Sequence, residues 1–241
     1  MESFKMDLSI IAQNISDARI RCSKSYKNCA DLLGISTARY KKYESGEIPP
    51  TLPELETLSF FFGKPLNSIL GIEYQETLDL PGAPEPDHLL NLLKIRNSVM
   101  GTLLQIEREK KSLSVKNLAA LCDISATTLK RFENGSLGIP LDDLATIIEE
   151  LELNLDMFLD LNSPIGVWQL SQKRIASFLT LPQELQDFIA DKDNHPYLSA
   201  AQKMKDFSSA DFKDLSEAIR IIIQKLPDDT SSANGQEQEW E

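Results

Sequence analysis

Two short basic clusters carry the residue types best suited to binding chemistry in this sequence. Arg39, Lys41 and Lys42 lie within four residues of one another, and Lys130 and Arg131 stand 89 residues after the two lysines. Lysine and arginine donate charge-assisted hydrogen bonds to anionic groups, and the planar fork of arginine also matches the paired acceptors of a guanine edge. These residue types and spacings therefore favour recognition of an anionic partner.

The sequence offers little to a catalytic or metal site. Among its 241 residues are 2 histidines, His88 and His195, and no second ligand or nucleophile stands near either of them. Glycine-rich phosphate loops and metal-ligand spacings are also missing from the sequence. The three cysteines, Cys22, Cys29 and Cys122, have neither an even count nor a CxxC spacing, so we interpret them as packing residues. We predict a protein that is not an enzyme and that uses no cofactor and no metal.

Each basic cluster lies near the end of a pattern that occurs twice without a gap. The first copy, Ser25 to Gly46, reads SYKNCADLLGISTARYKKYESG, and the second, Ser114 to Gly135, reads SVKNLAALCDISATTLKRFENG. In each copy one serine precedes each of two short apolar-periodic stretches, where its side chain can cap a helix by accepting a backbone N–H. Gly34 in the first copy permits a tight left-handed turn between the two stretches. The pattern predicts two short helices joined by a tight turn, twice in one chain.

These residues resemble the helix-turn-helix of the Cro and phage-repressor (XRE) type, over roughly Ile11 to Gly71 and again over Arg96 to Leu161. The resemblance implies an all-α fold made of two repressor-like five-helix domains followed by a helical C-terminal region. It also implies a bacterial transcriptional regulator that binds double-stranded DNA. Asp123 departs from the family, which usually has glycine at this turn, but aspartate tolerates the left-handed conformation better than most residues.

Composition and periodicity set the expected boundaries. We predict a first helix-turn-helix domain at residues 1–71, an acidic, proline-rich linker at 72–88, and a second helix-turn-helix domain at 89–162. A helical C-terminal region at 163–227 and a polar, disordered tail at 228–241 follow. An extended linker would reach on the order of 65 Å, more than the ~34 to 36 Å between half-sites one helical turn apart. The linker could therefore span two half-sites, or it could be packed.

The expected helices follow from apolar periodicity and capping residues. In the first domain a helix ends near Cys22, and others cover Ser25–Leu33, Ser36–Glu44, Pro53–Phe62 and Leu66–Leu70. In the second domain the helices cover Leu89–Glu109, Ser114–Leu121, Ser125–Glu133, Leu141–Leu151 and Asp156–Leu161. The C-terminal helices begin near Gln169, Pro182 and Leu198, and a last one follows a Ser208/Asp211 capping box. The apolar residues of this last helix form a narrow seam, a pattern that packing within the chain and homodimerisation through the C-terminal helices would both produce. The seam consists of Phe212, Leu215, Ile219, Ile222 and Leu226.

The resemblance also assigns roles to individual side chains. The positions that would meet base edges in the major groove are Thr37, Ala38, Lys41, Lys42, Ala126, Thr127, Lys130 and Arg131. The positions that would contact phosphates are Tyr26, Lys27, Arg39, Lys116, Thr128 and Asn134. Threonine and alanine cannot make a bidentate base contact, so direct readout should fall on Lys42 and above all on Arg131. Arg19 with Glu44, and Arg108 with Glu133, stand at positions that form structural ion pairs in the resembled repressors.

The distribution of charge along the sequence supports nucleic-acid binding more than the net charge does. The net charge is −12, but residues 11–43 hold seven basic against two acidic side chains, and residues 95–132 hold seven against three. Both expected DNA faces are therefore positive. No apolar run approaches the ~18 to 20 residues of a membrane span, and the N-terminus lacks a secretory apolar segment. We expect a cytoplasmic protein with no membrane partner.

Two interpretations remain at this point. The first is a sequence-specific DNA-binding transcriptional regulator with two helix-turn-helix modules. The second is a protein-interaction or antitoxin-like module, built on helix-turn-helix domains that no longer bind DNA. Small residues at the reading positions, the net negative charge and Val115, where the family often has glutamine, favour the second. The two separately basic helix faces favour the first.

Overall fold

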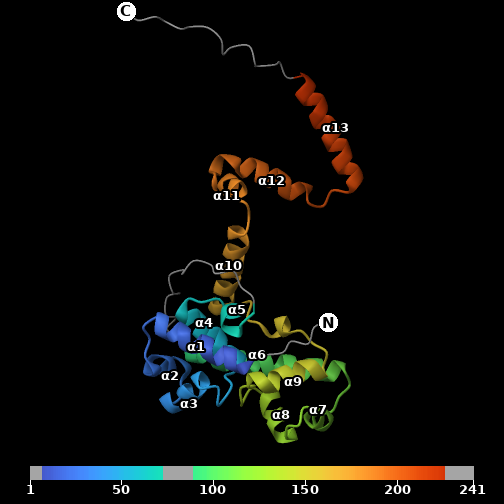
Figure 1. The fold of residues 1–241 in the computed structure, drawn as a ribbon. Helices are drawn as coiled ribbons and strands as arrows, with labels where there is room; N and C mark the ends of the chain where they lie inside the picture. The colour runs from blue at the N-terminus through green and yellow to red at the C-terminus, as the bar shows by residue number, and fades with distance from the viewer. Residues whose placement is uncertain (1–6, 73–88, 226–241) are drawn as a thin grey trace, which may run out of the picture. The chain divides into compact units, whose positions relative to one another are not determined.

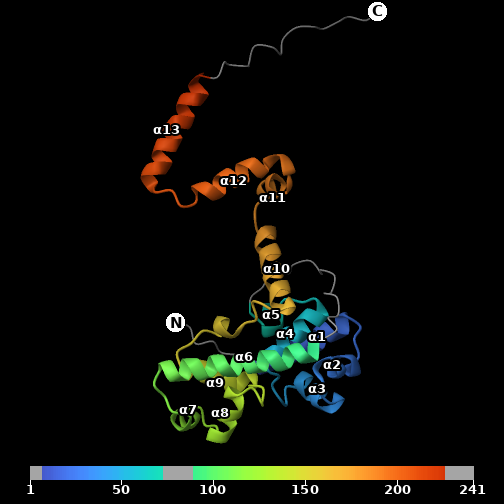
Figure 2. The ribbon, with the colours of Figure 1, turned by 180° about the vertical axis from the view of Figure 1, so that it is seen from behind.

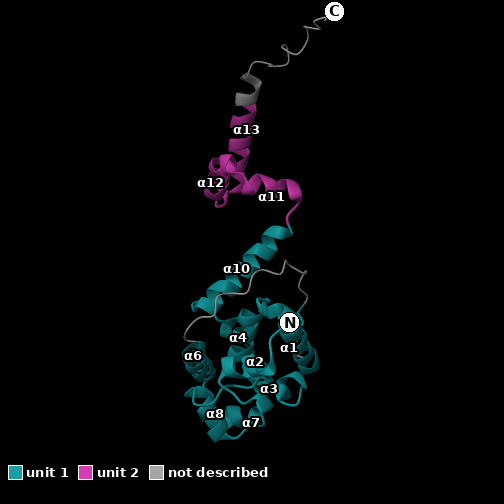
Figure 3. Cartoon of the chain, turned by 90° about the vertical axis from the view of Figure 1, so that its left-hand side faces the viewer, with its two compact units in different colours: residues 1–180 teal, residues 181–241 magenta. Residues whose placement is uncertain are grey.

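The computed structural model describes residues 7–72 and 89–225, so the proposed linker, from residue 73 on, and the polar tail lie outside the described residues. Within the described ranges the protein is all-α, as predicted, and the only β-type pairing is an isolated bridge between Thr51 and Pro140. The chain divides into two compact units, residues 1–180 and residues 181–241 (Figure 3).

The first unit begins with an N-terminal segment, defined here as residues 8–71. Its helices are α1 (Leu8–Arg21), α2 (Tyr26–Leu33), α3 (Thr37–Glu44), α4 (Leu52–Phe62) and α5 (Leu66–Leu70). Side-chain caps start four of them: Asp7, Ser25, Ser36 and Thr51 each accept backbone N–H groups at a helix N-terminus. Local chemistry therefore fixes where these four helices begin.

A central segment, residues 89–160, follows the same order. Its elements are α6 (Leu89–Lys110), α7 (Val115–Leu121), α8 (Ala126–Glu133), α9 (Leu141–Glu150) and the 3₁₀ helix η1 (Leu155–Phe158). The last element differs from the expected helix Asp156–Leu161, because it is a single 3₁₀ turn that ends at Phe158. Beyond it the Asp160 N–H donates to a carboxylate of α4, which draws the chain away from helical geometry.

Helix α4 lies at the centre of the first unit. Ten of its 11 residues are buried, including two glutamates, whereas a surface helix buries only one stripe. It can be enclosed in this way because α6 and α10 (Pro164–Leu179) pack against it in addition to the helices of the N-terminal segment. Figures 1 and 2 show α6 running from the N-terminal segment into the central one.

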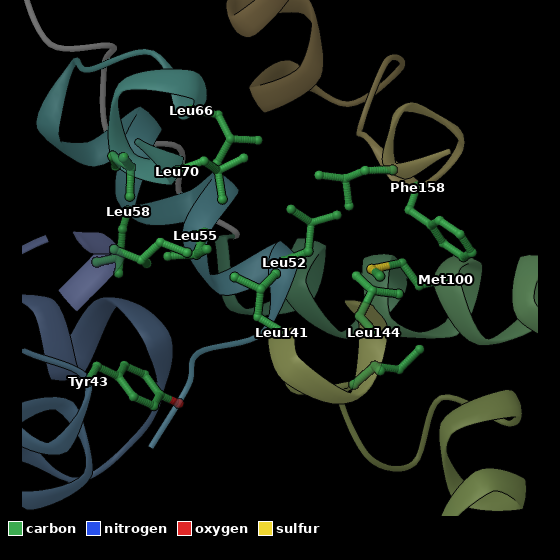
Figure 4. Close-up of a cluster of buried hydrophobic side chains, with 14 of the residues drawn as sticks. Tyr43, Leu52, Leu55, Leu58, Leu66, Leu70, Met100, Leu141, Leu144 and Phe158 are labelled. Carbon is green, nitrogen blue, oxygen red and sulfur yellow. The ribbon is translucent and has the colours of Figure 1, made fainter. Parts of the chain in front are cut away.

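The two segments share one hydrophobic core. Leu52 and Leu55 of α4, Met100 of α6 and Leu141 and Leu144 of α9 belong to one cluster of buried side chains. In Figure 4, Leu52 and Leu141 lie between the core residues of the N-terminal segment and those of the central segment. Burial of apolar area contributes about 25 cal/mol per Å², so this shared cluster couples the folding of both segments.

Helix α10 (Pro164–Leu179) is built onto the same unit. It begins at Pro164, five residues earlier than the sequence suggested, with Ser163 as its N-cap, and Ile165 is buried. Trp168 packs edge-on against Phe60 of α4 with ring centroids 5.4 Å apart. The Gln169 amide N–H donates to the Ser59 hydroxyl at 2.6 Å. These contacts attach the first 6 or so residues of α10 to α4.

The second unit contains α11 (Gln183–Ala190), η2 (Lys192–Asn194), α12 (His195–Met204) and α13 (Ser209–Lys225). The predicted capping box is present: the Asp211 N–H donates to the Ser208 hydroxyl, and the Ser208 N–H donates to the Asp211 carboxylate. No side chain of this unit is buried within residues 181–221. Phe212 and Ile219, two residues of the predicted apolar seam, are each 47% exposed.

Candidate nucleic-acid interface

The backbone repeats its special conformations at an interval of 89 residues. Left-handed φ angles occur at Ser23 and Ser112, at Gly34 and Asp123, at Gly46 and Gly135, and at Gly63 and Glu152. Non-glycine residues rarely adopt this conformation, so four coincident pairs indicate that the two segments follow the same backbone path. Among the described residues, Gly71 is the one left-handed residue whose counterpart 89 residues later, Asp160, does not share this conformation.

The turn between α2 and α3 has the geometry that the sequence pattern predicts. Gly34 ends α2 in the left-handed conformation, and the Ser36 hydroxyl accepts the Arg39 N–H as the N-cap of α3. In the central segment Asp123 takes the left-handed position, and the Ser125 hydroxyl accepts the Thr128 N–H at 2.9 Å. Both turns therefore start a short helix, α3 or α8, at the same point of the pattern.

A buried ion pair fixes each short helix against the first helix of its segment. Arg19 donates Nε to one Glu44 oxygen and a terminal nitrogen to the other, at 2.5 and 2.8 Å. Arg108 makes the same two contacts with Glu133 at 2.5 and 3.1 Å. Each carboxylate raises the pKa of its arginine, and each arginine also donates to the backbone carbonyl that precedes the capping serine by one residue. This bidentate geometry sets the angle of α3 and α8.

The side chains with expected base-reading roles lie on the outer faces of α3 and α8. All are exposed except Lys42, which is partly buried: Thr37, Ala38, Lys41, Ala126, Thr127, Lys130 and Arg131. The inward faces carry Tyr40, Tyr43, Leu129 and Phe132, each no more than 1% exposed. Figures 1 and 2 show α3 and α8 at the same end of the first unit, away from α10.

The side chains with expected phosphate-contacting roles surround these faces. Tyr26, Lys27, Lys116 and Asn134 are exposed, and Thr128 is partly buried with its hydroxyl 2.7 Å from that of Ser125. The Tyr26 ring lies 4.0 Å from the Arg19 guanidinium carbon and 5.2 Å from Lys41 Nζ. Tyr26 is therefore held rigidly beside α3 by cation–π contacts.

The two faces differ in how their cations are engaged. The Lys42 ammonium forms an ion pair with Glu47 in the loop after α3. Arg39 donates Nε to the Tyr43 hydroxyl at 2.9 Å, and its guanidinium lies 3.9 Å from Glu54. By contrast, no ion pair within the described residues involves Lys130 or Arg131. The cations of α8 are therefore open to an external anion, whereas two of the three on α3 already have acidic neighbours.

Glu47 and Glu54 were not among the residues expected from the pattern. Glu47 stands five residues after Lys42, and the position 89 residues later is Ser136. Comparing the two copies outside the helices would have revealed this acidic substitution. The Tyr43 hydroxyl donates to Glu54 at 3.0 Å, and burial together with this carboxylate raises the pKa of Tyr43.

A helix-turn-helix family model matches residues 104–158, from the second half of α6 to the end of η1. No curated protein and no solved structure gives a significant match. Residues 104–158 are therefore similar to a helix-turn-helix domain, a class associated with DNA binding and the regulation of transcription. Within the described ranges, no helix combines the length and the apolar character needed to span a membrane.

Proposed function

We propose that this protein is a sequence-specific transcriptional regulator that binds double-stranded DNA through two helix-turn-helix modules in one chain. The observation that carries the proposal is the recurrence, 89 residues apart, of the same capped turn, the same buried arginine–glutamate pair and the same exposed basic helix face. The family match covers the second copy. The first copy has the same construction, so it supports the same activity.

In this proposal α3 and α8 enter the major groove with their outer faces. Arg131 donates its guanidinium fork to a guanine edge, a contact that discriminates between bases by ~1 to 3 kcal/mol. The hydroxyl and ring groups of Thr128 and Tyr26, the cations Lys27, Arg39 and Lys116, and the Asn134 amide bind the flanking phosphates. The buried ion pairs hold the helices at the angle that this docking requires.

A protein-interaction or antitoxin-like role is the second candidate. It is favoured by the acidic neighbours of Lys42 and Arg39, which reduce the positive potential of the α3 face. It is also favoured by the small side chains at positions 37, 38, 126 and 127. Under this alternative both faces would bind a protein surface, and affinity for duplex DNA would be negligible even at low salt.

Binding of the full chain to a random-sequence duplex across a salt series tests the proposal. The log of the affinity should fall with log salt at a slope of about 0.9 per phosphate neutralised. The double variant Lys42→Ala/Arg131→Ala should bind more weakly and with a shallower slope. Lys173→Ala/Arg174→Ala removes the same charges from exposed positions of α10 and serves as the matched control. Absence of binding at low ionic strength would refute the DNA-binding function and direct the search to protein partners.

A further inference from the structure

A charged network crosses the boundary between the N-terminal and central segments. Arg96 of α6 donates Nε and a terminal nitrogen to the two carboxylate oxygens of Glu56 of α4, at 3.1 and 3.0 Å. The same guanidinium donates to the Phe158 carbonyl, and the Asp160 N–H donates to Glu56 at 2.8 Å. The network therefore ties α4 of the first segment to both ends of the second.

The network is enclosed, so it acts on orientation more than on net stability. The Glu56 side chain is 3% exposed and that of Arg96 10%. Buried pairs of this kind contribute little net stability because desolvation offsets the Coulomb attraction, whereas a bidentate contact admits only one relative orientation.

Two further contacts hold the same boundary. The Leu141 N–H donates to the Pro50 carbonyl at 3.0 Å, beside the bridge between Thr51 and Pro140. A side chain at Gly34 would meet the side chain of Leu90, so the first turn of α6 lies directly against the turn between α2 and α3. One hydrophobic cluster fills the remaining space between the segments. No rotation of one segment against the other preserves all of these contacts.

We propose that the Arg96–Glu56 network and the shared core hold α3 and α8 at one separation and one rotational phase, so that a single chain recognises a composite DNA site whose two unlike halves have one permitted spacing. This inference rests on the proposed DNA-binding function. It differs from the expectation for two domains joined only by a flexible tether, which would accept several spacings because a tether adapts its length.

The test is binding of the full chain to duplexes that differ only in half-site spacing. Sites are first selected from a random library. About five base pairs, half a helical turn, or about ten, a full turn, are then inserted between the two halves of the site. Either insertion should lower affinity by about tenfold or more, since one half then loses its contacts. Bound stoichiometry should be one chain per site.

Glu56→Gln is the variant that probes the network itself. The amide keeps the shape of the side chain but weakens the bidentate pair, so the affinity ratio between the uninserted and inserted sites should shrink. Glu152→Gln is the control, because it removes an exposed ion pair with Lys111 that lies within the central segment. Glu152→Gln should leave the spacing dependence of the wild type unchanged.

The outcomes separate the two proposals. Tight binding by the wild type that is indifferent to spacing, or two chains bound per site, would overturn the fixed-phase inference while leaving DNA binding intact. Failure to bind any duplex would instead refute the proposed function on which it rests. If Glu56→Gln fails to fold, the dependence of wild-type affinity on half-site spacing still tests the inference.

Discussion

Glu47 should weaken DNA binding by the α3 face. Replacing it with serine, the residue at the equivalent position of the central segment, should strengthen binding. Glu47 forms an ion pair with Lys42, and the equivalent position in the central segment is Ser136, where no acid faces Arg131. We expect Glu47→Ser to bind DNA more tightly than the wild type. The reciprocal change, Ser136→Glu, should bind more weakly.

The expected size of the effect follows from the exposure of the pair. The side chains of Lys42 and Glu47 are 43% and 58% exposed, and exposed ion pairs contribute about 0.2 to 1 kcal/mol. Releasing the lysine therefore accounts for about a 1.4- to fivefold gain in affinity. Removing the acid from the neighbourhood of phosphates also removes a repulsion of the order of 1 kcal/mol or less, screened by salt. Together the two contributions predict a gain of about 1.4- to 30-fold at low salt.

The assay is fluorescence anisotropy on one selected duplex over a salt series. If Lys42 becomes a phosphate contact in Glu47→Ser, the slope of log affinity against log salt should steepen by about 0.9. Glu184→Ser removes one negative charge from α11 of the second unit, so it controls for net charge alone. The reasoning fails if Glu47→Ser binds no more tightly than Glu184→Ser, or if Ser136→Glu binds as well as the wild type.

Three further predictions concern the scaffold. Gly101→Ala should destabilise the fold by about 1 to 3 kcal/mol in urea unfolding, because the added carbon would lie 2.6 Å from the carbonyl oxygen that ends α8 and still closer to the preceding one. Ala12→Gly, at the equivalent position of α1, should lose about 1 to 2 kcal/mol, from lower helix propensity and the loss of a buried methyl group. Arg108→Met should cost about 3 to 5 kcal/mol in the same assay by leaving its carboxylate partner buried and unpaired. Burial raises the pKa of Cys29 and of Cys122 to about 11, so at pH 8 both thiols should resist a disulfide reagent in the native protein and react on unfolding in guanidinium. Rapid reaction of either thiol in the native protein would contradict the packing described.

The sequence predicts the local structure of the first unit closely because that structure is set by local chemistry. Ser25, Ser36, Ser114 and Ser125 were expected to cap helices from their position before apolar-periodic stretches, and each accepts a backbone N–H three residues on. The left-handed turn at Asp123 was likewise expected, because the resembled family usually has glycine at this position, and it has a φ of 53°. Such features depend on a few neighbouring residues, so one sequence is enough to find them.

The contact between the two segments could not be predicted in the same way. Glu56 and Arg96 are 40 residues apart, and each stands among charges that pattern alone assigns to a solvated helix face. The available signal was indirect: Phe60, Phe61 and Phe62 are consecutive, so they cannot all lie on one stripe of a helix. A helix that is apolar on several sides must be covered on several sides. Helix α6, which covers part of α4, was predicted from the sequence, but its contact with α4 was not.

The rigid pairing of two unlike faces leads to an expectation about the DNA site itself. A symmetric homodimer presents one surface twice and reads a palindrome. In the proposed arrangement both reading faces belong to one chain. Lys42, which pairs with Glu47, stands at the position equivalent to Arg131, which has no acidic partner in the described residues. If both faces dock in the fixed arrangement proposed, the halves of the site must differ in sequence and in energetic weight. The half read by α8 should carry a guanine and most of the specificity, because the arginine fork makes a bidentate contact that a lysine already paired with a carboxylate does not.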